Sequence, residues 1–169
     1  MADVATVTTL PPAARFSVRG SGPAVSALGI AFGVELPREA CRAAGNGKHA
    51  ALWLGPDEWL LLAPDEEAEE LGRTLASGLH GEAASIVDIS DRQVAITLSG
   101  AKAAEAIGAF NALDLELDAF PVGMCTRTLF GKAEIVLWRT APDAFHIEVW
   151  RSFAPYVLAC LEEALREYA

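Results

Sequence analysis

Two aspartates, Asp88 and Asp91, form the most suggestive pair of reactive side chains in the sequence. They lie in ValAspIleSerAspArgGln at 87–93, where a sharp break between two apolar runs can hold side chains rigidly. Two carboxylates held close together can serve as general acid and general base. Alternatively, Asp88, Ser90 and Asp91 bond local backbone N–H groups where one strand passes into the next, and this is the interpretation we favour.

Two glycine-rich segments resemble nucleotide-binding loops only superficially. GlyAsnGlyLysHis at 45–49 has the Gly-Lys pair of a phosphate-binding loop, but His49 stands where Ser or Thr is needed and a strand is expected to follow. GlySerGly at 20–22 begins a dinucleotide-binding pattern, but Val25 occupies the position of the third glycine. We therefore read the first segment as a loop and discard the second match.

The residues that most often bind metals or act as nucleophiles are scattered along the chain. These are His49, His80, His146, Cys41, Cys125 and Cys160. No HxxxH, CxxH or CxxC pair occurs, so we predict no metal site, no disulfide framework and buried free thiols. No spacing points to a nucleophilic Cys-His pair.

Aromatic and acidic side chains allow both a functional and a structural interpretation. The four tryptophans all fall in expected strands: Trp53, Trp59, Trp138 and Trp150. They could stack on a ring-bearing ligand such as a pterin, although core and interface anchoring is the commoner use of tryptophan. The acidic run at 66–70 is most simply a solvated helix face, and its alternative is a docking surface for a basic partner.

Hydrophobic period and turn residues predict the elements that would position these side chains. Strands are expected at 15–19, 51–55, 58–63, 85–89, 93–98, 126–130, 134–139 and 145–150. Helices are expected after Pro23, after Asp65, after Gly100 and after Ser152, where Asp65 and Ser152 can cap the first turn. Residues 38–48 and 111–123 read as loops.

These elements repeat along the chain. Residues 16–32 and 95–110 share a strand, a glycine turn and a helix, and residues 55–71 and 141–161 share a Pro-Asp turn, a strand and a helix. Each half is therefore predicted to be a β-α-β-β-α unit of the ferredoxin-like type. We expect an α+β fold with antiparallel or mixed sheets and helices packed on them. Residues 1–14 would be an extended segment, followed by a single domain, 15–169, of two pseudo-repeats at about 15–90 and 91–169.

Composition excludes several classes of partner. The chain has 169 residues, 52% of them hydrophobic, which suits one soluble globular unit. Its net charge of −10 disfavours nucleic acid and anionic membranes. The longest uncharged run, Gly20 to Val34, is too short and too rich in glycine to span a membrane. The N-terminus lacks the basic and apolar regions of a secretory signal, so a cytoplasmic protein is expected.

The negative charge is concentrated in the middle of the chain. Residues 65–118 carry twelve acidic and three basic side chains, whereas residues 1–64 carry five of each and residues 119–169 carry six and five. Desolvating unpaired carboxylates is costly. If the chain is a subunit of an assembly, the two near-neutral thirds should contribute more of the buried interface.

Five segments occur together in the order and spacing of one family. They are residues 53–61 (TrpLeuGlyProAspGluTrpLeuLeu), 87–92 (ValAspIleSerAspArg), 98–100 (LeuSerGly), 120–130 (PheProValGlyMetCysThrArgThrLeuPhe) and 145–153 (PheHisIleGluValTrpArgSerPhe). From about Arg15 onward, the chain resembles the gamma subunit of heterotetrameric sarcosine oxidase. The fold that this resemblance implies is that of the folate-binding part of the glycine-cleavage T-protein superfamily.

The resemblance also implies a role in a flavoenzyme. Such a complex demethylates sarcosine oxidatively to glycine and hydrogen peroxide, and passes the one-carbon unit to tetrahydrofolate. FAD, FMN, NAD and tetrahydrofolate would be bound by the larger subunits and zinc by the smallest, so that this chain holds no cofactor. Its partners would be the alpha, beta and delta subunits. The KGCYxGQE-type segment of other superfamily members is absent, which argues against independent folate binding.

We therefore expect a non-catalytic subunit that is required for assembly, with residues 1–14 extended on a partner. Arg127, Arg139 and Arg151 are candidate polar anchors, because arginine makes bidentate contacts with carboxylates. Arg151 and Ser152 could instead form a local helix cap. Two alternatives remain open: a stand-alone folate-binding or aminomethyltransferase-like protein, and a domain that pairs with itself as a homodimer when isolated.

Overall fold

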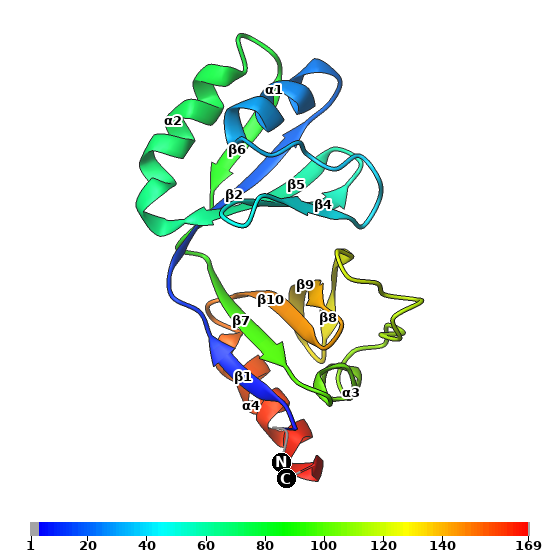
Figure 1. The fold of residues 1–169 in the computed structure, drawn as a ribbon. Coiled ribbons are helices and arrows are strands. Elements are labelled where there is room, and N and C mark those ends of the chain that lie inside the picture. Colours follow the sequence, from blue (N-terminus) through cyan, green and yellow to red (C-terminus); the bar gives the residue numbers. More distant parts are fainter. Residues whose placement is uncertain (1–3, 169) are drawn as a thin grey trace. The chain divides into compact units, whose positions relative to one another are not determined.

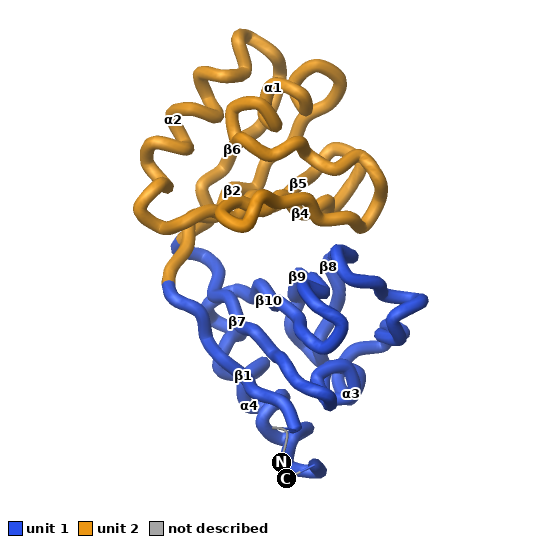
Figure 2. Tube along the Cα trace, viewed as in Figure 1, with its two compact units in different colours: residues 1–11, 91–169 blue, residues 12–90 orange. Residues whose placement is uncertain are grey.

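Residues 4–168 are described in the computed structural model, and they form two five-stranded antiparallel sheets that carry helices (Figure 1). The chain divides into two units. Residues 12–90 form one, and the described parts of residues 1–11 and 91–169 form the other (Figure 2). The backbone therefore passes between the units twice, after Pro11 and after Ser90.

The unit of residues 12–90 contains one complete ferredoxin-like motif. Its elements are β2 (Ala13–Gly20), α1 (Pro23–Phe32), β3 (Ala43–Gly45), β4 (Ala50–Gly55), β5 (Glu58–Pro64), the 3₁₀ turn η1 (Asp65–Glu67), α2 (Ala68–Gly78) and β6 (Ala84–Asp88). The sheet order is β3-β4-β5-β2-β6. Alternate residues of β2, including Phe16 and Val18, join Leu28 and Phe32 of α1 and Leu75 of α2 in the core.

The second unit has the same layout but takes one strand from the N-terminus. Its elements are β1 (Thr6–Thr9), β7 (Gln93–Ser99), α3 (Ala103–Gly108), β8 (Cys125–Phe130), β9 (Ala133–Ala141), β10 (Ala144–Trp150), α4 (Ala154–Leu165) and the 3₁₀ turn η2 (Arg166–Tyr168). The sheet order is β1-β7-β10-β9-β8. Phe120, Phe130 and Phe145 lie fully inside its core with Val157 and Leu161 of α4.

The two sheets correspond strand for strand. In the first, the strands β4-β5-β2-β6 lie side by side, and in the second β9-β10-β7-β1 repeat that order. The fourth strand follows α2 directly in the first unit, whereas in the second it is β1, paired antiparallel with β7 from Thr6 opposite Ser99 to Thr9 opposite Ile96. Thr6–Thr9 therefore belongs to the chain's own sheet and is not a separate extended segment. Residues 1–3 of that expected segment lie outside the described residues.

The ends of the helices differ from the sequence-based expectation. The segment after Asp65 begins with the 3₁₀ turn η1, and α2 itself starts at Ala68 without a side-chain cap. Helix α4 starts at Ala154, and its capping residue is Phe153. Ser152 is therefore not the cap, because Pro155 at the start of α4 and the turn of residues 151–153 shift the helix start towards the C-terminus. No helix of residues 4–168 is long and apolar enough to cross a membrane.

Candidate docking surface

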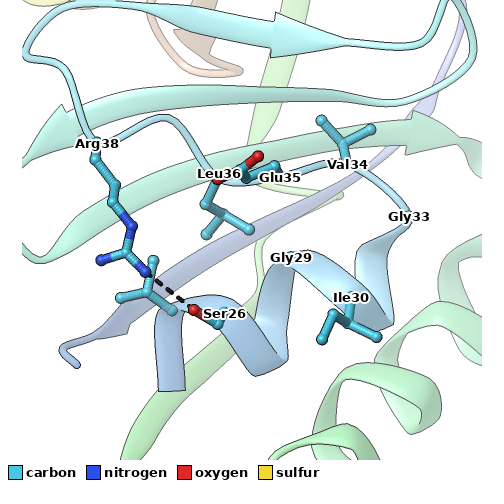
Figure 3. Close-up of a pocket in the computed structure, with 9 residues that line it drawn as sticks. Ser26, Gly29, Ile30, Gly33, Val34, Glu35, Leu36 and Arg38 are labelled. Carbon is cyan, nitrogen blue, oxygen red and sulfur yellow. Dashed lines mark hydrogen bonds between the residues drawn. The ribbon is translucent and has the colours of Figure 1, made fainter. Parts of the chain in front are cut away.

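An apolar groove of about 350 Å³ lies between helix α1 and the segment that follows it, residues 33–38 (Figure 3). Its lining includes the buried side chains of Val25, Val34 and Leu36. One end is marked by Arg38, whose guanidinium donates a hydrogen bond to the Ser26 hydroxyl at 3.0 Å. Ile30 lies on the rim and is 83% exposed. The groove therefore combines apolar contact area with two exposed charged side chains, the cation of Arg38 and the carboxylate of Glu35.

Two glycines allow residues 33–38 to fold back over α1. Gly33 ends the helix in the left-handed conformation, with φ 77°, and its N–H donates to the carbonyls of Gly29 and Ile30. Gly29 faces the returning chain, where an added Cβ would lie 3.3 Å from backbone atoms of Glu35 and Leu36. Glycine at both positions thus permits the close approach that forms the groove.

The returning segment is fixed at both ends. The indole N–H of the buried Trp59 donates to the Pro37 carbonyl at 2.8 Å, and the Asn46 amide donates to the Gly33 carbonyl at 3.4 Å. Together with the bond between Arg38 and Ser26, these contacts hold the segment against its own unit. The groove is consequently preformed in the isolated chain.

The segment of residues 45–49 contacts the C-terminal end of helix α1. The Asn46 side-chain oxygen accepts from the backbone N–H groups of Lys48 and His49, which makes a tight turn. The His49 ring stacks on Phe32 with centroids 4.8 Å apart, and its Nδ1 lies 2.9 Å from the Phe32 carbonyl oxygen. His49 Nε2 lies 2.8 Å from Glu67, which also pairs with Lys48. These side chains tie the end of α1 to the turn before α2.

That cluster has two shifted pKa values with one cause. The hydrogen bond from Lys48, followed by that from His49, lowers the pKa of Glu67 below its usual value. The same hydrogen bond to Glu67 raises the pKa of Lys48. Lys48 and Glu67 therefore neutralise each other, so that the lysine of the glycine-rich segment at 45–49 pairs with a carboxylate of its own chain.

The two candidate carboxylates between β6 and β7, Asp88 and Asp91, have different partners. Asp88 accepts hydrogen bonds from the backbone N–H of Ser90 at 2.9 Å and from its hydroxyl at 2.6 Å. The Ser90 hydroxyl oxygen in turn accepts from the backbone N–H of Arg15 at 2.9 Å. Asp91 is fully exposed and lies 3.7 Å from the Arg151 guanidinium. Asp88 thus bonds local backbone, as favoured from the sequence, whereas the Ser90 hydroxyl bonds the distant backbone of Arg15 and Asp91 takes no part in that network.

Arg139 is the arginine whose surroundings differ most from expectation. It is 3% exposed, and its guanidinium donates to the carbonyls of Leu115 at 2.9 Å and Phe120 at 2.5 Å. It also lies 4.6 Å from the centre of the Phe145 ring. Burial lowers the pKa of this guanidinium below its usual value. The prediction that Arg139 anchors a partner is therefore wrong. Its side chain points into its own unit and holds the loop of residues 111–123.

The other two candidate arginines lie at the surface. Arg127 on the edge strand β8 lies 3.7 Å from Glu134 of the neighbouring strand. Arg151 follows β10, where its backbone N–H donates to the Arg92 carbonyl. Beside it, the Arg92 guanidinium lies 5.1 Å from the centre of the exposed Trp150 ring. Arginine and tryptophan are enriched at the centres of protein interfaces, and Arg92 was not among the arginines predicted as anchors from the sequence.

The remaining candidates for ligand binding have structural contacts. Within residues 4–168, no three His, Cys, Asp or Glu side chains gather in a way that could hold a metal ion. His146 lies 2.8 Å from the buried Glu148 and packs against Trp138. Trp59 is buried, and all four tryptophans are in strands, as the sequence predicted. The groove itself was not predicted. The uncharged run from Gly20 to Val34 could have indicated it, because it leaves helix α1 without a charged side chain on any side.

The comparisons with known proteins agree with this architecture. A model of the sarcosine oxidase, gamma subunit family matches residues 19–167. The sarcosine oxidase subunit gamma of Corynebacterium sp. (strain P-1) is 34% identical over 154 residues, which cover 90% of this chain and 74% of that protein. The sarcosine oxidase subunit gamma of Arthrobacter sp. is 32% identical over 145 residues, covering 85% and 70%.

Solved structures extend the agreement to the fold. A chain of the heterotetrameric sarcosine oxidase from Corynebacterium sp. U-96 superposes with a TM-score of 0.91 at 29% identity, covering 97% of this chain and 85% of that chain. The glycine cleavage system aminomethyltransferase T from Bartonella henselae has a TM-score of 0.71 at 16% identity, covering 93% and 45%, which shows the fold alone. The α+β fold expected from the sequence is confirmed. The family match over residues 19–167, with relatives above 30% identity, shows that the chain belongs to the sarcosine oxidase gamma subunit family.

Proposed function

We propose that this chain is a non-catalytic subunit of a heterotetrameric sarcosine oxidase, in which it stabilises the assembly. The observation that carries the proposal is the TM-score of 0.91 with a chain of the heterotetrameric enzyme of Corynebacterium sp. U-96. The superposition covers 97% of this chain, so nearly all of its fold is also present in that protein. The complex would oxidise sarcosine to glycine and hydrogen peroxide, with tetrahydrofolate accepting the one-carbon unit.

The local chemistry of the chain supports a structural role. Asp88 accepts a hydrogen bond from Ser90. Two of the three histidines contact nearby carboxylates, His49 with Glu67 and His146 with Glu148. These groups therefore stabilise turns and strands. We propose accordingly that the flavins, NAD and tetrahydrofolate bind to the alpha and beta subunits and zinc to the delta subunit, in the cytoplasm.

The surface supports an assembly role as well. Several large apolar side chains are well exposed in the isolated chain, among them Ile30 at 83% and Leu129 at 62%. Trp150 at the end of β10 and Phe153 just before helix α4 are close in sequence and are 43% and 41% exposed. Exposed aromatic and aliphatic side chains of this size are typical of surfaces that a partner covers.

The test is affinity purification of the tagged chain from its native host. We expect a yellow complex with three other chains in equal amounts, releasing hydrogen peroxide when sarcosine is added. A colourless protein that elutes alone or as a homodimer, while sarcosine-dependent peroxide release elutes elsewhere, would contradict the proposal. Titration of the isolated chain with tetrahydrofolate should leave its tryptophan fluorescence unchanged, and saturable quenching would favour a stand-alone folate-binding protein.

A further inference from the structure

We infer that the groove between α1 and residues 33–38 is the docking site for a segment of another subunit, one that presents an apolar side chain next to a carboxylate. This inference rests on the proposed function, because it needs partner subunits. It specifies which face of the chain they cover and by what chemistry. The site lies within the unit of residues 12–90 and is complete there.

The first support is the apolar character of the outer face of α1. No charged side chain occurs between Gly20 and Val34, so the whole helix Pro23–Phe32 lacks one. Helices that are apolar on all sides are normally buried on all sides. Ile30 is nevertheless 83% exposed, more than any other large hydrophobic side chain among the described residues. A partner that covers Ile30 resolves this mismatch between composition and exposure.

The second support is the charge at the end of the groove. Arg38 is exposed, and its guanidinium donates to the neutral hydroxyl of Ser26. Among residues 4–168, no carboxylate lies within ion-pair distance of Arg38, although most other arginines of the chain have such a partner. Arginine binds carboxylates through two parallel hydrogen bonds. Glu35 also lines the groove, but Arg38 lies at its end and has no carboxylate within ion-pair distance among the described residues, so the apolar floor and this cation favour a segment with an apolar side chain next to an acidic one.

The third support is the rigidity of the groove. The segment of residues 33–38 is held at Gly33 by Asn46 and at Pro37 by Trp59, and Arg38 is held by Ser26. A preformed groove requires little ordering of the chain when a partner binds, so more of the contact energy contributes to affinity. The groove also lies in the near-neutral first third of the sequence, where a partner would cover one lining carboxylate, Glu35, and not a cluster of them.

The experiment compares two groove variants with two matched controls in the complete complex. Tagged chains replace the native copy in the host, and the purified complex is diluted to measure how tightly the chain is held. Ile30→Gln removes the apolar contact and Arg38→Gln removes the charge, whereas Ile30→Leu keeps an apolar side chain. Arg166→Gln removes an arginine that is 75% exposed at the far end of the chain. We expect each groove variant to raise the Kd for the other subunits about tenfold or more, and the controls to leave it unchanged.

Further readouts separate the possible outcomes. Thermal unfolding of the isolated variants should change little, because Ile30 and Arg38 are exposed and the hydrogen bond of Arg38 to Ser26 lies at the surface, while the contacts of Trp59 and Asn46 still hold residues 33–38. Arg38→Gln should also weaken the salt dependence of assembly. If the wild-type chain recovers no other subunits, the proposed function fails. If wild type and groove variants assemble equally well, only the docking site is wrong. An isolated chain that forms a homodimer dissociated by Ile30→Gln would assign the groove to a second copy and overturn the inference.

Discussion

The hydroxyl oxygen of Ser90 accepts a hydrogen bond from the backbone N–H of Arg15 at 2.9 Å, although the two residues are 75 positions apart. The neighbouring Ile89 N–H donates to the Arg15 carbonyl at 2.8 Å, which continues the pairing of β6 with β2 beyond Asp88. Asp88 fixes the direction of the Ser90 hydroxyl, which donates a hydrogen bond to the carboxylate at 2.6 Å. This network secures the last residues of β6 where the chain leaves the unit of residues 12–90.

Replacing Ser90 by alanine should destabilise the chain. The substitution leaves the backbone N–H of Arg15, a residue only 1% exposed, without this acceptor. We expect a loss of about 1–2 kcal/mol in the free energy of unfolding, measured by urea denaturation. Asp91→Asn is the control, because Asp91 is fully exposed and its pair with Arg151 should contribute little. An equal loss in both variants would show that the network does not stabilise the crossing.

Replacing Arg139 by methionine should release the loop of residues 111–123. Methionine keeps much of the side-chain volume but leaves the carbonyls of Leu115 and Phe120 without their donor. We expect a loss of about 3 kcal/mol in unfolding free energy. Amide hydrogen exchange of Phe120 and Gly123 should also accelerate. Arg166→Met, at an exposed site, should change stability by less than about 0.5 kcal/mol, and unchanged exchange in Arg139→Met would contradict the anchoring role.

The pair of Lys48 and Glu67 should make stability depend on pH in a defined direction. The pKa of Glu67 is lowered by the hydrogen bond from Lys48, so its contribution is present above the ordinary pKa of 4.5 and is lost as pH falls through the lowered value. The pKa of Lys48 is raised, so its contribution is present below 10.5 and is lost as pH rises through the raised value. The pair therefore stabilises the fold across the neutral range.

Lys48→Gln should consequently lower the free energy of unfolding at neutral pH and have a smaller effect in acid, well below the ordinary pKa of Glu67. Urea denaturation of wild type, Lys48→Gln, Glu67→Gln and the double variant across this pH range measures the coupling directly. A coupling energy that stays constant from neutral to acidic pH would contradict the assignment.

Gly100→Ala should detach the N-terminal strand β1. Gly100 has φ 134°, and an added Cβ would lie 2.6 Å from the Cα of Ala5, so both strain and collision oppose the substitution. We expect a loss of about 1–3 kcal/mol and faster amide exchange in Thr6–Thr9. Gly108→Ala is the matched control: its Cβ would meet nothing within 4 Å, and alanine favours the helix α3. Unchanged exchange in β1 would mean that the strand is not held as described.

Elements with a clear hydrophobic period were predictable from the sequence. The three strands expected after residue 124 are confirmed. Short elements were not: β3 (Ala43–Gly45) lies in an expected loop because its three residues carry no apolar alternation, and its pairing with β4 creates it. The same holds for β1, whose partner β7 is about ninety residues away in sequence.

The chemistry of individual side chains divides in a similar way. Residue types and local spacing were enough to indicate the α+β class, the internal repeat and the bond of Asp88 to nearby backbone, because these depend on neighbours in sequence, and the order of several motifs indicated the family. The contact of the Ser90 hydroxyl with Arg15, 75 positions away, was not predictable in this way. Only the tertiary structure decided that Arg139 points into its own unit, and that Gly29 and Gly33 let residues 33–38 form a groove beside an exposed Ile30. Burial and long-range hydrogen bonds depend on which distant segments the fold brings together, and no local pattern specifies them.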